Sequence, residues 1–318
     1  MKNIVFCCDN NYAPFLAVTI KSILCNNTAH DCHFHIFCND IDEVNRNRIY
    51  DVVHKSDAIV SFRNIVDDKL RSLEKRKWPI NAWHRVLLPE ILPNLDRVLY
   101  FDADTIVMGN LDYLFKMDIS HHSIGAVIDI ESFENSAYQR CGYPQELKYI
   151  CSGVLLMNLA YWRANGLTDK IIKWGIENAD RLKCPDQDAI NHVCANDKIV
   201  LPLKYGILST FNFKHHHDFV KNNKKECIDM LDNPIIVHYA GMQPWFYEKR
   251  NHFFREEWDK YNKMLEIPIK KRHYFHGKQL IMHWLRLWYK SIGLGTYSPQ
   301  ITAQPESLET IRNRFINS

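Results

Sequence analysis

The chain has 318 residues, of which 46% are hydrophobic and 24% charged, a balance typical of a folded globular protein. This length allows one large α/β domain or two smaller ones. The formal net charge of +3 is too small to indicate nucleic-acid binding, and no nucleic-acid-binding motif accompanies it, so we expect no nucleic-acid partner.

The ten cysteines are scattered and form no CxxC pair, which favours buried free thiols in a reducing compartment over a disulfide framework. The N-terminus lacks the apolar core of a signal peptide, and no apolar run reaches transmembrane length. We therefore expect a cytoplasmic protein that is soluble or peripheral at the inner face of the membrane.

Apolar strands and amphipathic helices alternate along the first hundred residues. A first strand at 4–8 is followed by a helix that carries Leu16, Ile20 and Ile23 at helical spacing. Further elements follow in order: strand 33–38, helix 42–54, strand 58–62, helix 81–92 and a strand that ends before Asp102. This alternation predicts an α/β fold with a Rossmann-like, mostly parallel central sheet flanked by helices.

The second half continues the pattern with strands at 123–128, 154–158 and 235–237. A helix is predicted over 168–182, and another begins at Pro185, whose place beside acidic residues suits a helix N-terminus. We expect a catalytic domain over residues 1–265 and a C-terminal helical appendage over 266–318.

Asp102 and Asp104 follow the apolar strand Arg97–Phe101 directly. At an i, i+2 spacing, two side chains of a strand point to the same face. Carboxylates at the C-terminal end of a strand in an open α/β sheet lie where such sheets bind ligands. The pair therefore predicts a divalent-cation site that holds a phosphate-bearing substrate; the alternative is a solvated turn rich in aspartate.

Three more polar clusters stand at predicted strand ends or helix starts, at 9–12, 186–188 and 238–245. His238 closes an apolar strand and precedes a turn that contains Gly241. Two carboxylates and one neutral imidazole suit Mn²⁺, with Mg²⁺ as the alternative. We expect His238 to complete a metal site with Asp102 and Asp104.

The order of these motifs resembles that of the family 8 retaining glycosyltransferases, a group that includes lipooligosaccharide galactosyltransferases and glycogenin. The resemblance spans residues 1 to about 260 and implies a fold of the GT-A type. It also implies Mn²⁺-dependent transfer of glucose or galactose from a UDP-sugar to an acceptor hydroxyl, with retention at the anomeric carbon. The acceptor it suggests is a saccharide or glycolipid of lipopolysaccharide type.

The resemblance assigns roles residue by residue. Asp9 and Asn11 would hydrogen-bond uracil while Tyr12 stacks on it, and Asp102, Asp104 and His238 would hold Mn²⁺ on the diphosphate. Positions that it places around the donor are Ala103, Cys151, Gly241 and Gln243. Those that it places near the reacting sugar are Arg85, Asp129, Asp186, Gln187 and Asp188. Because glutamine is a poor nucleophile, we expect same-face attack by the acceptor, with Asp186 and Asp188 orienting sugar hydroxyls.

Two positions depart from the family pattern. Cys151 stands where the family usually has an asparagine that touches the donor hexose, and Gln243 replaces a lysine that binds phosphate. A neutral amide lacks the charge that a lysine offers to a diphosphate. A nucleotide-sugar-binding module with weak catalysis is therefore one alternative. A haloacid-dehalogenase-like phosphatase is another, because Phe101–Thr105 also resembles its nucleophile loop.

The segment 269–290 contains six basic residues and no acidic one, and Ile281, Trp284 and Trp288 share a helical face. A basic amphipathic helix with tryptophans is typical of membrane-surface binding. A helix docked on the catalytic domain fits the same pattern, and the sequence does not separate the two.

Overall fold

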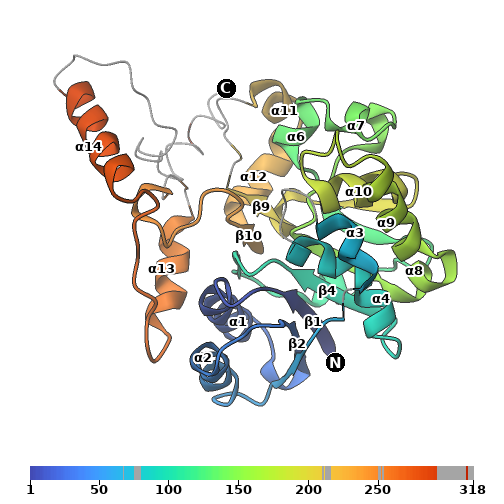
Figure 1. The fold of residues 1–318 in the computed structure, drawn as a ribbon, viewed down its shortest axis with the longest axis horizontal. Helices are drawn as coiled ribbons and strands as arrows, with labels where there is room; N and C mark the ends of the chain where they lie inside the picture. Colours follow the sequence, from blue (N-terminus) through green and yellow to red (C-terminus); the bar gives the residue numbers. More distant parts are fainter. Residues whose placement is uncertain are drawn as a thin grey trace.

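The computed structural model describes residues 1–66, 68–74, 80–209, 211, 216–249, 252, 254–291 and 313. A seven-stranded sheet forms its centre (Figure 1). In spatial order its strands are β3 (Ile59–Arg63), β2 (Cys32–Phe37), β1 (Lys2–Cys7), β4 (Arg97–Phe101), β7 (Val154–Asn158), β6 (Ile124–Val127) and β8 (Lys198–Leu201). A second sheet of three strands has the order β5 (Thr105–Val107), β10 (Ile236–His238), β9 (Ile207–Leu208).

The main sheet is mostly parallel, as predicted. Strand β1 pairs in parallel with β2 and β4, β2 with β3, and β6 with β8. Strand β7 is antiparallel to both β4 and β6. As a result, the N-terminal end of β7 lies beside the C-terminal end of β4, which Asp102 directly follows.

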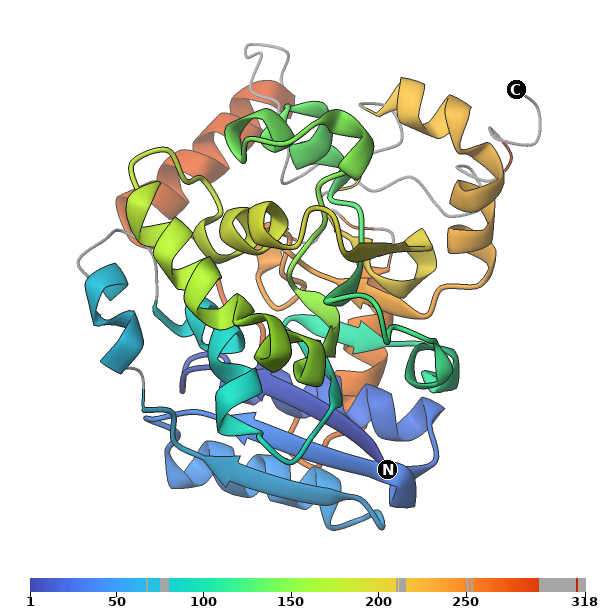
Figure 2. The ribbon, with the colours of Figure 1, turned by 90° about the vertical axis from the view of Figure 1, so that its right-hand side faces the viewer.

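Helices flank this sheet on both sides (Figures 1 and 2). The α-helices are α1 (Ala13–Asn26), α2 (Glu43–Val53), α3 (Arg71–Glu74), α4 (Leu88–Ile91), α5 (Asp112–Lys116), α6 (Ile130–Glu134), α7 (Ala137–Arg140), α8 (Leu159–Asn165), α9 (Leu167–Glu177), α10 (Pro185–Val193), α11 (His217–Asn222), α12 (Lys224–Asp232), α13 (Arg255–Lys263) and α14 (Lys278–Ser291). The 3-10 helices are η1 (Ala29–Asp31), η2 (Asp68–Leu70), η3 (Ile80–Leu87), η4 (Gln145–Leu147), η5 (Leu203–Tyr205) and η6 (Tyr247–Lys249).

Strand β1 shows how the two layers of the core arise. Its successive side chains point to opposite faces, so Ile4 and Phe6 pack with α1, α2 and α13, whereas Val5 and Cys7 pack with η3, α9 and α10. A strand covered on both faces is apolar throughout, which explains why these strands read as continuous hydrophobic runs.

Two predicted helices differ from the observed ones. The segment predicted as one helix over 81–92 is the 3-10 helix η3 followed by the short helix α4. Pro89 stands in the first turn of α4, because a proline has no N–H to continue a preceding helix. Helix α9 ends at Glu177 rather than at Leu182, with Asn178 as its C-cap.

The segment that follows α13 contacts the rest of the protein before the chain reaches α14. Asn262 forms two hydrogen bonds with the backbone of Ile269, and the N–H of Arg272 donates to the carbonyl of Trp245. Beyond these contacts, α14 lies on the far side of the molecule from α8 and α9 (Figure 1). The domain boundary at 265 stays a prediction, and residues 292–312 and 314–318 of the predicted appendage lie outside the described residues.

Among the described residues, no helix combines the length and the apolar character that crossing a bilayer requires.

Candidate active site and metal centre

Asp102, Asp104 and His238 lie together, and each offers a ligand atom within 4.8 Å of the others. Nε2 of His238 is 3.1 Å from a carboxylate oxygen of Asp104 and 3.7 Å from one of Asp102. The antiparallel pairing of β5 with β10 sets this geometry, because it places His238 opposite Thr105. Sequence analysis placed the three residues in one site, but it did not foresee the small sheet that joins them.

The orientation of the His238 ring suits a divalent cation. Its Nδ1 faces the Cys151 sulfur at 3.6 Å, which leaves Nε2 directed at the two carboxylates. Two carboxylates and one imidazole are a donor set that Mn²⁺ and Mg²⁺ accept. The residues present therefore fit a metal. Cys151, predicted to contact the donor, contacts this histidine.

Gly153 makes room for the imidazole. A Cβ at this position would lie 2.1 Å from a carbon of the His238 ring, far closer than atoms pack. The N–H of Asp102 also donates to the carbonyl of Gly153 at 2.8 Å. Glycine is thus required just before β7, because the His238 ring rests directly on its backbone.

The environment of His238 favours its charged form when no metal is bound. Burial alone would lower the pKa of His238, but Asp104 and the neighbouring Cys151 raise that pKa well above its ordinary value. Below this raised pKa the imidazolium stabilises the metal-free fold, and the contribution is lost as the pH rises through it. A metal ion and this proton therefore compete for the same nitrogen.

Arg85 links the metal-site carboxylates to helix α10. Its guanidinium donates to Asp102 at 2.9 Å and lies 3.3 Å from a carboxylate oxygen of Asp186. It also donates to the carbonyl of Ser152 and is nearly fully buried. Burial opposes the charged form, but Asp102 and its other neighbours raise the pKa of Arg85. A buried arginine with these partners stays charged and fixes both carboxylates in place.

Gln187 is held at both ends of its amide. Its Nε2 donates to Asp129 at 2.9 Å, and its Oε1 accepts from the N–H of Ser152 at 2.9 Å. A carboxylate only accepts and a backbone N–H only donates, so these two partners fix which end of the amide is which. Asp129 also caps α6 by accepting from the N–H of Ser132.

Asp186 and Asp188 point in different directions, which corrects one expectation. We expected both to orient sugar hydroxyls. Asp188 is fully buried and accepts from Arg140, from the hydroxyl of Tyr149 and from the N–H of Lys183. Side chains two residues apart on a helix lie on different faces, so only Asp186 turns toward Arg85 and Asp102. Asp188 holds α10 against its surroundings instead.

The segment after β1 reaches the same site. Tyr12 is partly exposed, and its ring stands edge-on to both Phe15 and Trp245. Burial, followed by the nearby carboxylates of Asp104 and Asp102, raises the pKa of Tyr12 to about 12. Through the contact of Tyr12 with Trp245, the predicted uridine segment borders the 238–245 cluster that begins with His238. Asp9 accepts from the N–H of Tyr12 at 3.0 Å, whereas Asn11 is exposed.

The remaining predicted donor positions lie on the loops that join these elements. Gly241 has a φ of 77°, in the left-handed region that glycine adopts without strain. The carbonyl of Gln243 accepts from the N–H of Phe246. Ala103 is buried, and its carbonyl accepts from the hydroxyl of Thr19.

Sequence analysis missed Tyr100, Ser152 and Gly153. The Tyr100 hydroxyl donates to Asp102 at 2.7 Å, and its ring lies under the Arg85 guanidinium. Tyr100 lies on β4, two residues before Asp102, which directly follows that strand, so strand alternation is a signal that could have identified it. The role of Ser152 and Gly153 depends on the reversed direction of β7, which the sequence does not reveal.

Comparisons with known proteins agree on one family. A sequence model described as Glycosyl transferase family 8 matches residues 3–249. A putative glycosyltransferase of Haemophilus influenzae is 28% identical over 255 residues, which cover 79% of this chain and 74% of that protein. A lipopolysaccharide 1,2-glucosyltransferase of Escherichia coli is 27% identical over 249 residues, which cover 76% of this chain and 73% of that protein.

Solved structures show the same fold. The galactosyltransferase LgtC, crystallised with donor and acceptor sugar analogues, superposes with a TM-score of 0.72 at 24% identity. The match covers 83% of this chain and 96% of LgtC. The predicted GT-A-type arrangement is confirmed by this likeness.

The close approach of Gly153 to His238 makes a testable prediction. In Gly153→Ala the new methyl group would displace the imidazole, so affinity for Mn²⁺ should fall by about tenfold or more. Titration of free Mn²⁺ by electron paramagnetic resonance measures this loss. Gly125→Ala is the matched control, because the nearest atom, on Leu201, lies 3.3 Å from the added carbon. Unchanged Mn²⁺ affinity in Gly153→Ala, with the fold intact, would contradict the assignment of His238 as a ligand.

Competition between metal and proton at His238 predicts a pH dependence. Mn²⁺ binding should release a proton at neutral pH. At pH values below the raised pKa of His238, the affinity of the protein for Mn²⁺ should rise by up to about tenfold for each unit of increase in pH. Calorimetric titration in buffers of different ionisation enthalpy counts the protons released. His238→Gln should bind Mn²⁺ more weakly and release no proton. Binding without proton release by the unaltered protein at pH 7 would exclude this competition.

Proposed function

The chain belongs to glycosyltransferase family 8, with lipopolysaccharide glucosyltransferases among its relatives, and on this premise we propose that it transfers a hexose from a UDP-hexose to a hydroxyl of a saccharide or glycolipid acceptor. The observation that carries the proposal is the cluster of Asp102, Asp104 and His238 beside Tyr12. It supplies a cation site next to a partly exposed aromatic ring, as a nucleoside diphosphate requires.

The donor lies, in this proposal, across the ends of β1 and β4. Tyr12 stacks on the uracil while Asp9 and Asn11 meet its polar edge, and Gln243 and the backbone around Gly241 line the diphosphate. Asp102, Asp104 and His238 hold Mn²⁺, or Mg²⁺ in its place. When bound, such an ion acts as a Lewis acid that offsets the negative charge of the departing diphosphate.

The hexose occupies the space between the metal ligands and helix α10, where Asp129, Asp186 and Gln187 surround it. Arg85 pairs with the Asp102 and Asp186 carboxylates and holds them in place. Gln187 is no nucleophile, because its amide oxygen already accepts from the N–H of Ser152. We therefore propose retention by same-face attack, in which the acceptor hydroxyl gives its proton to the departing phosphate oxygen.

The active-site composition of a matched structure supports the place given to Gln187. One LgtC structure carries an active-site variant in which glutamate replaces glutamine, so an active-site glutamine occurs in that enzyme. We propose that Gln187 has the corresponding place here and fixes Asp129 toward the sugar.

The phosphatase alternative is not favoured, because the matched family transfers glycosyl groups. One oxygen of Asp102, the nucleophile in that alternative, also accepts from both Arg85 and Tyr100. A binding module with weak catalysis remains a second candidate, favoured by the neutral Gln243 in place of a lysine.

The proposal predicts UDP release from UDP-glucose or UDP-galactose in the presence of Mn²⁺. Asp104→Asn should lower kcat/KM by about a hundredfold, because a ligand of the charge-stabilising ion is lost. Asp31→Asn is the control, since Asp31 is a solvent-facing residue of η1, which precedes β2. UDP binding without turnover of either donor would favour the binding module. Phosphate release from a simple phosphate ester would instead support the phosphatase alternative.

We also propose that α14 contacts a membrane surface, which would bring a glycolipid acceptor to the enzyme. Ile281, Trp284, Leu285 and Trp288 are each at least 43% exposed and recur at helical spacing. Lys278 and Arg286 lie on the same helix. Apolar side chains of this kind insert at the headgroup boundary, and basic ones are drawn to anionic lipids.

Replacement of Ile281 and Trp284 by alanine should weaken sedimentation with vesicles that contain an anionic lipid by about tenfold, because the inserted apolar area is lost. Met264→Ala is the control, as Met264 is an exposed apolar residue that follows α13 instead. Equal sedimentation of the double variant and the unaltered protein would exclude α14 as the contact.

A further inference from the structure

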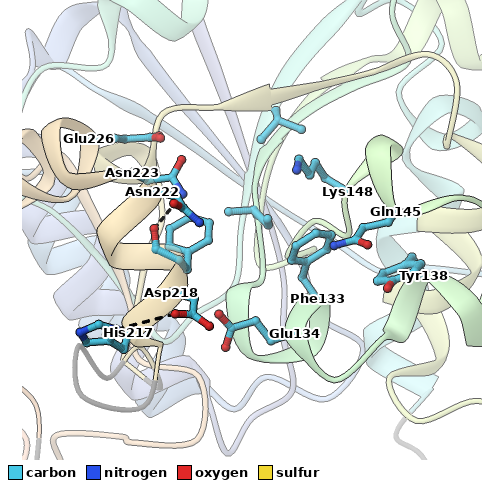
Figure 3. Close-up of a pocket in the computed structure, with 13 residues that line it drawn as sticks. Phe133, Glu134, Tyr138, Gln145, Lys148, His217, Asp218, Asn222, Asn223 and Glu226 are labelled. Carbon is cyan, nitrogen blue, oxygen red and sulfur yellow. Dashed lines mark hydrogen bonds and ion pairs between the residues drawn. The ribbon is translucent and has the colours of Figure 1, made fainter.

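A cavity of about 830 Å³ lies outside the metal centre, between the segment 133–148 and helices α11 and α12 (Figure 3). Its volume falls within the range of about 300–1,000 Å³ that is usual for small-molecule sites. None of the predicted donor or metal-site residues lines it. The reaction proposed above therefore leaves it unused.

The side chains around this cavity combine apolar rings with planar polar groups. Phe133 and Tyr138 come from one wall, and Phe219 comes from α11 in the other. Asn222 and Asn223 face Gln145 across the space in Figure 3. Rings offer apolar faces to the C–H groups of a sugar, and side-chain amides donate to and accept from its hydroxyls.

The charge of the lining favours an uncharged ligand over an anionic one. Glu134, Asp218 and Glu226 contribute three carboxylates to the lining, against the single ammonium of Lys148 and the imidazole of His217. A phosphate or sulfate group placed here would meet an excess of negative charge. An uncharged ligand meets no such penalty.

The two walls are fixed to each other. His216, the buried N-cap of α11, lies 2.5 Å from a carboxylate oxygen of Glu134, at the end of α6. On the opposite side, Lys148 adopts a φ of 55°, and its ammonium lies over the Phe133 ring at 5.0 Å. A non-glycine residue held at positive φ costs energy and is concentrated at ligand sites. The cavity is thus built into the fold rather than left by loose packing.

Helix α6 joins this cavity to the reaction centre. Its N-cap is Asp129, which accepts from Gln187, and its last residue, Glu134, lines the cavity. Five residues of helix rise by only about 7 Å. A short oligosaccharide spans that distance.

We propose that this cavity binds the distal sugars of an uncharged oligosaccharide acceptor whose reactive end lies near Asp129. The inference rests on the proposed glycosyl transfer and adds to it that the acceptor is a chain of several sugars rather than a single one. Binding at the cavity then selects acceptors by length.

The test compares acceptors of one to four hexose units made of glucose and galactose. The ratio of kcat/KM for a tetrasaccharide to that for a monosaccharide should fall by about tenfold in Asn222→Trp, mainly through KM, because the indole fills the cavity. Tyr138→Ala should lower the same ratio by removing a ring. Lys221→Ala is the matched control on α11, since Lys221 lies outside the lining.

A second readout needs neither donor nor metal. Saturation-transfer NMR should show contacts to the tetrasaccharide in the unaltered protein and lose them in Asn222→Trp. An unchanged kcat/KM ratio and unchanged NMR contacts in this variant would overturn the proposal, as would stronger binding of hexose phosphates than of neutral sugars. Absence of UDP release from every donor, with the NMR contacts present, would reject the proposed transfer but not the sugar site.

Discussion

The Asp104 and Asp186 carboxylates are buried and the Asp102 carboxylate is partly buried, so their charge has to be balanced. An unpaired buried carboxylate is too costly to persist, so cationic partners determine how this part of the chain folds. Arg85 balances Asp102 and Asp186, and its own position depends on the 3-10 helix η3. Asp104 relies on His238, or on a metal ion that takes the place of the imidazole proton. The geometry of the site follows from this balance.

The strands that lead to the site could be predicted because they are apolar runs. Strands β1, β2, β4 and β7 were located within one or two residues, since their burial on both faces leaves a continuous hydrophobic signal. Strands β5, β8 and β9 were not predicted; β5 has only three residues and β9 only two. The single helix expected over 81–92 does not form, and the reason is local, because a proline stands at the start of α4.

The site itself was only partly predictable. Residue types and motif order placed Asp102, Asp104 and His238 in one predicted metal site, and the three do lie together. They did not indicate which way neighbouring side chains face. Asp188 was grouped with Asp186 because the two are only two residues apart in one acidic segment, whereas the helical period buries Asp188 against Arg140. The contact between Cys151 and His238 joins residues 87 positions apart, and only the folded chain brings them together.

The three residues join the two sheets. Asp102 follows β4 of the large sheet, whereas Asp104 directly precedes β5 and His238 ends β10, both in the small one. An ion bound to all three residues would cross-link the two sheets. Binding of the ion would therefore stabilise the packing of the two sheets against each other, because a ligand that binds only the folded arrangement adds to its stability.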